Sequence, residues 1–69
     1  MFDRRKFRAE LALRDMSFKD LAKLLKLNES TVYRKVNADG DFSRAEINIM
    51  IDELDLQNPD SIFFTKTLA

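Results

Sequence analysis

The fold of this chain is decided by residues 17–36, which read SFKDLAKLLKLNESTVYRKV. Apolar residues recur there at helical spacing in two short groups, at 21–25 and at 32–36. Residues 26–28 break the pattern between the groups, and the apolar Leu27 is expected to fill the gap between two helices. The stretch therefore predicts two short helices joined by a turn. The second helix is so short and polar that its neighbours must stabilise it.

Helix start signals divide the rest of the chain in the same way. Ser17 with Asp20, and Ser43 with Glu46, have the spacing of capping boxes. The expected N-caps of five short helices are Asp3, Ser17, Asn28, Ser43 and Asn58, the last with Pro59 at the first helical position. Gly40 is expected at positive φ in the loop 37–41. The predicted fold class is therefore an all-α, compact bundle of five short helices, in a single domain spanning residues 1–69.

The amino-acid composition excludes several classes of function for this protein. The 69 residues include no cysteine and no histidine, which excludes disulfides and the commonest zinc ligands. We find no catalytic constellation, so we expect no enzyme, no metal and no cofactor. No apolar run approaches the roughly 20 residues that span a bilayer. Charges occupy the N-terminal region where a signal peptide would be apolar, so a cytoplasmic protein without membrane contact is expected.

Charge is unevenly distributed although the net charge is zero. Residues 1–44 hold 11 of the 12 basic residues and seven acids, whereas residues 45–69 hold one lysine and five acids. Four cations oppose the dipole of the first helix near its start, namely Arg4, Arg5, Lys6 and Arg8. This local conflict indicates that the charges serve a partner, and the alternative is an unevenly charged solvated surface.

The stretch 17–36 resembles the helix-turn-helix of the Cro and repressor family of regulators from temperate phages and bacteria. Ala22 occupies the family's small position, where the two helices cross. The family's apolar positions are matched by Leu21, Leu25, Leu27 and Val32. The continuation RKVNADGDFSRAEI also looks like the loop and fourth helix of small phage members, so the resemblance covers roughly residues 7–54. It implies a lambda-repressor-like fold and a sequence-specific, DNA-binding transcriptional regulator, such as a Cro-like protein of a lysis/lysogeny switch.

Three positions depart from the family pattern. Lys26 stands where many members have glycine, and its left-handed conformation would be strained, which leaves a rearranged or longer turn as an alternative. Phe18 replaces a glutamine that reaches phosphate in many members. Glu29 opens the second helix and would repel phosphate, although it can accept from cytosine.

The second helix of such a motif reads base edges in a major groove about 12 Å wide. The predicted DNA- or partner-binding residues are Asn28, Glu29, Ser30, Thr31, Tyr33, Arg34 and Lys35. Phosphate contacts are predicted for Asn37, Ser43, Arg44 and Lys19.

Several of these residues have structural alternatives. Asn28 and Ser43 could serve only as helix caps, and Tyr33 could pack on the loop. Glu29 could pair with Arg14 or Lys35.

Large apolar residues in the C-terminal part of the chain form a second group of interest. Ile49, Phe64 and Leu68 have no evident place in so small a core and are a candidate protein interface, consistent with a homodimer on operator DNA. Phe63 or Phe64 is expected to close the core over the first helix. The competing hypothesis for function is an antirepressor that keeps this fold, binds a phage repressor protein and controls its DNA binding. Zero net charge, Phe18 and Glu29 favour that alternative.

Overall fold

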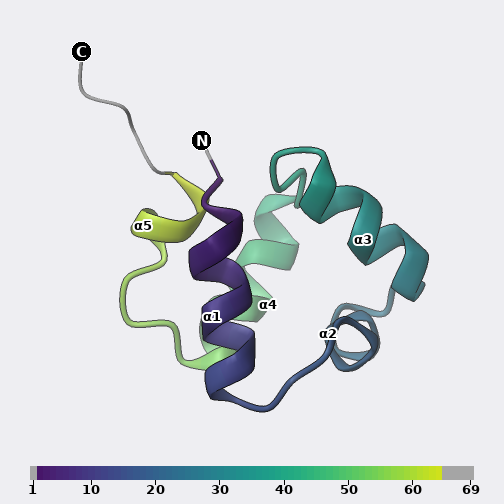
Figure 1. The fold of residues 1–69 in the computed structure, drawn as a ribbon, viewed down its shortest axis with the longest axis horizontal. Coiled ribbons are helices and arrows are strands. Elements are labelled where there is room, and N and C mark those ends of the chain that lie inside the picture. The colour runs from purple at the N-terminus through teal and green to yellow at the C-terminus, as the bar shows by residue number, and fades with distance from the viewer. Residues whose placement is uncertain (1, 65–69) are drawn as a thin grey trace.

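The computed structural model describes residues 2–64, which contain helices and no strand. The helices are α1 (Arg4–Leu13), α2 (Phe18–Leu25), α3 (Glu29–Asn37), α4 (Arg44–Leu54) and α5 (Asp60–Phe63). In Figure 1, α5 lies on one side of α1 and the pair α2–α3 lies on the other. The all-α prediction is confirmed. No helix among these residues is long and apolar enough to cross a membrane.

Three of the predicted helix starts are confirmed by hydrogen bonds. The Ser17 side chain accepts from the Asp20 N–H (3.2 Å) while the Asp20 carboxylate accepts from the Ser17 N–H (3.0 Å). Ser43 and Glu46 make the same reciprocal pair at 3.1 and 2.8 Å. Asp3 accepts from the Lys6 N–H at 3.0 Å and so caps α1. These side chains satisfy N–H groups that a helix start leaves free.

The other two predicted N-caps differ in outcome, because Asn28 is at the N-cap position of α3 as predicted and Asn58 is not at the N-cap position of α5. The Asn28 side chain makes no cap hydrogen bond, and its backbone carbonyl accepts from the Thr31 and Val32 N–H groups. The last helix begins at Asp60, with Pro59 at the N-cap position rather than Asn58. The Pro59 carbonyl accepts from the Ile62 and Phe63 N–H groups, and the Asn58 carbonyl accepts from the Ser61 N–H group.

Phe7 lies at the centre of the core, with a relative exposure of 1%. Its ring meets those of Phe2, Phe18, Phe42 and Phe63, at centroid distances between 5.2 and 6.4 Å. Phe63 therefore closes the core over α1, as predicted for one member of the pair, and Phe64 stays exposed. Leu27 packs partly buried against the same core, which confirms its predicted place in the turn.

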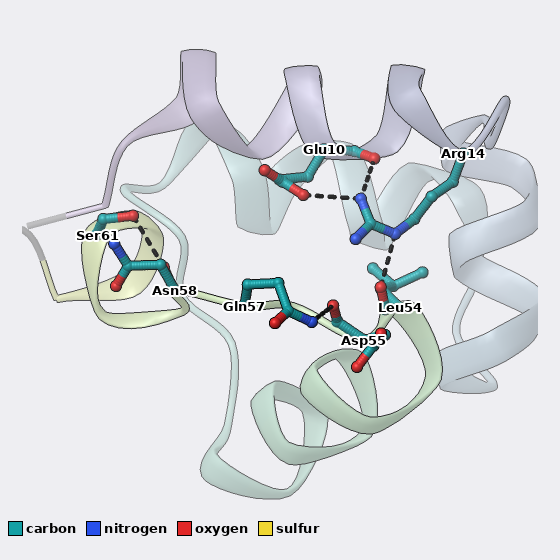
Figure 2. A network of polar contacts seen from close by, with 7 residues as sticks. All are labelled: Glu10, Arg14, Leu54, Asp55, Gln57, Asn58 and Ser61. Carbon is teal, nitrogen blue, oxygen red and sulfur yellow. Dashed lines mark hydrogen bonds and ion pairs between the residues drawn. The ribbon is translucent and has the colours of Figure 1, made fainter.

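Arg14 joins the C-terminal ends of α1 and α4 (Figure 2). Its Nε donates to the Leu54 carbonyl at 2.6 Å, and its Nη1 donates to the carbonyl and the carboxylate of Glu10, both at 2.7 Å. The Leu54 carbonyl belongs to the last turn of α4 and has no intrahelical partner. A single guanidinium thus fixes the relative position of two helices.

Left-handed backbone occurs at the turns. Gly40 has φ of 70°, as predicted, and a side chain there would also collide with the Phe2 ring. Lys26 takes the left-handed conformation too, with φ of 59° and ψ of 42°. The turn between α2 and α3 is therefore not rearranged, and lysine occupies a position that favours glycine.

Candidate nucleic-acid interface on α3

The exposed side of α3 is set by the two valines that hold it. Val32 and Val36 are buried, with exposures of 0% and 2%. At about 100° per residue, Ser30, Arg34 and Asn37 lie on the opposite side of the helix, and all three are exposed. We call these three residues the α3 outer face. In Figure 1, α3 is an outer helix of the molecule.

One flank of the outer face is fixed by Tyr33. Its ring packs edge-on against Phe18 of α2, with centroids 4.6 Å apart and an interplanar angle of 66°. The Arg8 guanidinium lies 5.0 Å from the centre of the Phe18 ring. Tyr33 therefore packs on α2, whereas the alternative drawn from the sequence placed it on the loop. Phe18 acts as a buried bridge between α1, α2 and α3.

The other flank is fixed by Lys35, which is half-buried. Its Nζ lies 3.4 Å from a carboxylate oxygen of Glu46 and donates to the Asp41 carbonyl at 3.1 Å. Since Arg14 pairs with Glu10, the suggested pairing of Glu29 with Lys35 or Arg14 is wrong. Glu29 is exposed in the first turn of α3, where its charge interacts favourably with the helix dipole.

Folding lowers the pKa values of two carboxylates, those of Glu46 and Asp20. Burial raises the pKa of Glu46, but the Ser43 N–H and the Lys35 charge outweigh it, and the net pKa is lowered. The Ser17 N–H is the main cause of a lowered pKa at Asp20. Both shifts arise where a carboxylate accepts from the N-cap backbone of a helix.

Arg4 joins the α3 outer face from α1, although the sequence pattern placed it only in the cluster of cations at the start of the first helix and not among the predicted binding residues. Its Nη1 donates to the Asn37 side-chain oxygen at 3.2 Å. A hollow of about 210 Å³ at this end of α3 is lined by Phe2, Arg4, Val36, Asn37 and Asp39. The signal in the sequence was the cluster of cations at the start of α1, but it did not identify which cation faces α3.

The other predicted residues are scattered around this face. Lys19 and Arg44 are exposed in the first turns of α2 and α4, Asn28 is exposed, and Thr31 is half-buried. The Ser43 side chain is engaged in the cap of α4. The structure thus brings together Ser30, Arg34 and Asn37, and holds Lys35 in an ion pair within the protein.

The residues predicted as a protein interface do not form one patch. Phe64 is 54% exposed and lines a groove with residues of α4, whereas Ile49 is 38% exposed and does not line that groove. Leu68 lies outside the described residues.

No protein-family model, curated protein or solved structure matches this chain at a significant level. The function is therefore inferred from the geometry and charge of α3 and its surroundings.

Proposed function

We propose that this protein binds double-stranded DNA sequence-specifically through α3 and regulates transcription. The observation that carries the proposal is the α3 outer face, a row of polar side chains along a helix whose other side is anchored by Val32 and Val36. A single exposed helix of this kind fits a major groove about 12 Å wide. Side chains in such a row reach consecutive base edges.

Each group on this face has a chemical role in the proposal. Arg34 offers two parallel donors that match the O6 and N7 acceptors of guanine, and Ser30 can donate or accept. Asn37 and Arg4 share a hydrogen bond at the C-terminal end of α3, where they are suited to a backbone phosphate. Lys19 and Arg44 add exposed cations at two helix starts.

The resemblance to Cro and repressor proteins supports a more specific form of this proposal. In that form the protein is a Cro-like regulator of a temperate-phage switch, which acts in the cytoplasm of the bacterial host by occupying an operator.

The test begins with a duplex selected from a random-sequence pool, whose affinity is measured by fluorescence anisotropy. Arg34→Ala is expected to weaken binding to the selected duplex about tenfold to a hundredfold, because a bidentate guanine contact is worth about 1–3 kcal/mol. Arg34→Lys keeps the charge but not the fork of donors. It should therefore retain binding to unrelated duplexes and lose the preference for the selected one.

Lys6→Ala is the surface control, because Lys6 lies about 160° around α1 from Arg4 and is exposed. Its affinity should equal that of the wild type, and circular dichroism should show that all variants are folded. Failure to select any duplex at low salt would contradict the proposal.

One observation favours a second candidate, a regulator that binds a repressor protein. Glu29 is exposed at the start of α3, where a phosphate backbone would be repelled and a basic protein surface attracted. If no duplex is selected and α3 variants instead lose binding to a repressor encoded beside this gene, the second candidate replaces the first.

A further inference from the structure

Two arginines of α1, one helical turn apart, are joined to two side chains of α3 that are also one turn apart. Arg4 donates to the Asn37 side-chain oxygen at 3.2 Å. Arg8 and Tyr33 both contact the ring of Phe18, whose centre lies 5.0 Å from the Arg8 guanidinium carbon and 4.6 Å from the centre of the Tyr33 ring. We call Arg4, Asn37, Arg8 and Tyr33 the α1–α3 seam.

The Arg8 and Tyr33 end of the seam has polar groups that the described part of the protein does not use. Within residues 2–64, neither the Arg8 guanidinium nor the Tyr33 hydroxyl has a hydrogen-bond or ion-pair partner. Arg8 is exposed and Tyr33 is 45% exposed, whereas Phe18 is buried and holds both of them in place. A cation–π contact restrains a guanidinium but leaves N–H donors free for an anion.

A hollow of about 280 Å³ lies at this end of the seam. Arg8 and Tyr33 line it together with Phe18 and with the apolar side chains of Leu11 and Met16. A lining of this kind combines an apolar surface with one cation and one phenolic donor. It matches the sugar–phosphate backbone of a nucleic acid, because the C–H groups of a sugar can cover the apolar surface while the phosphate accepts from the cation and the phenol.

We infer that the α1–α3 seam binds two neighbouring phosphates of one DNA strand, and that Arg8 with Tyr33 holds the second of them. The first lies at Arg4 and Asn37. The two arginines are about 6 Å apart along α1, so they can meet neighbouring phosphates of a strand. Phe18 is a positioning residue, because it holds Arg8 and Tyr33 and has no donor of its own. The inference rests on the proposed function and assigns a second DNA contact to α1.

A DNA strand is the occupant that charge and position favour. Neither Arg4 nor Arg8 forms an ion pair among the described residues, so both bring an uncompensated positive charge to the seam. Asn37 belongs both to the seam and to the α3 outer face. A duplex that receives α3 in its major groove therefore carries its backbone past the seam. An acidic peptide offers the same charge but lacks this continuity with the α3 outer face.

Fluorescence anisotropy of the full chain with the selected duplex and with an unrelated duplex tests the contact at Arg8. Arg8→Ala should weaken both complexes alike, by about tenfold at about 0.1 M salt, because one phosphate contact is lost. For the same reason it should reduce the slope of log affinity against log salt by about 0.9 in magnitude. Tyr33→Phe keeps the ring on Phe18 and removes the hydroxyl, so it should weaken binding about threefold without changing the slope.

Phe18→Leu tests the positioning role, because leucine keeps an apolar side chain in the core but offers no ring to a cation. In this background Arg8→Ala should weaken binding by less than about threefold, since Arg8 is no longer held in place. Lys6→Ala is the matched control. It removes an equal charge from an exposed position about 160° around α1 from Arg8 and should bind like the wild type. If Phe18→Leu does not fold by circular dichroism, Arg8→Ala and Tyr33→Phe decide alone.

The possible outcomes separate this inference from the proposed function. If a duplex is selected through Arg34 but Arg8→Ala has the affinity and slope of the wild type, only the inference is refuted. If the wild type binds all duplexes alike and Arg8→Ala weakens that binding, the seam is supported and only sequence-specific recognition is refuted. A wild type that binds a polyglutamate peptide but no duplex at low salt overturns both.

Discussion

Lys26 shows how one residue can carry backbone strain at the turn between the two helices. The Leu27 N–H reaches back to the Ala22 carbonyl at 2.8 Å across this turn, which closes the end of α2. That closure needs a left-handed residue at position 26, where a side chain costs free energy and glycine does not. The other non-glycine residues at positive φ among the described residues are all aspartates, which tolerate this conformation better than lysine.

Lys26→Gly is therefore expected to raise the free energy of unfolding by about 0.5–1 kcal/mol, measured by urea denaturation. Lys23→Gly is the control, because Lys23 is exposed in the same helix and glycine there should cost about 1 kcal/mol. Equal effects of the two substitutions would show that the conformation of Lys26 is not strained.

At the scale of elements, Glu46 couples α3 to α4. It caps α4 through the Ser43 N–H and pairs with Lys35 of α3. The folded protein lowers the pKa of Glu46 from its usual value near 4.5. Its contribution to stability is therefore complete above about pH 4.5. It is lost as the pH falls through the lowered pKa, because protonation of the carboxylate removes the charge that Lys35 meets.

Glu46→Gln should thus destabilise the protein at neutral pH by about 0.5–1 kcal/mol and flatten its loss of stability between pH 5 and pH 3. Glutamine keeps an acceptor for the Ser43 N–H but carries no charge. Urea denaturation at several pH values measures the free energy of unfolding and its dependence on pH. The control is Glu53→Gln, an exposed acid of the same helix, which should keep the pH dependence of the wild type.

At the scale of the whole molecule, the uneven charge distribution matters more than the net charge of zero. Arg4, Lys19 and Arg44 are exposed on three different helices, and in the proposed function they meet phosphates on both sides of α3. Each phosphate contact releases counterions and so adds to the salt dependence of binding.

With three such contacts, a plot of log affinity against log salt should have a slope of about −3 per protomer. Lys19→Ala should reduce the magnitude of this slope by about 0.9 and weaken binding to all duplexes alike. Lys6→Ala should leave the slope unchanged. A slope near zero for the wild type would show that Arg4, Lys19 and Arg44 do not contact phosphate.

Most of the helices and their starts could be predicted from the sequence, because the deciding interactions are local. Asp3, Ser17 and Ser43 bond to groups three residues away, and the spacing of Val32 and Val36 marks the buried side of α3. The same reasoning put Ser30 and Arg34 on one exposed face. The same local reasoning put Asn58 one residue too early, because Pro59 takes the N-cap position of α5, and it did not show that the Asn28 side chain makes no cap hydrogen bond.

The sequence by itself determined the all-helical architecture and the composition of the α3 outer face. Only the tertiary structure decided which distant side chains meet. Arg14 bonds to the Leu54 carbonyl 40 residues away, and Arg4 bonds to Asn37 33 residues away. Such partners depend on how the helices pack around Phe7. A local sequence pattern, which spans only a few residues, therefore does not reveal them. The same packing turned Tyr33 towards Phe18, held Lys35 within the protein and left the groove beside α4 open.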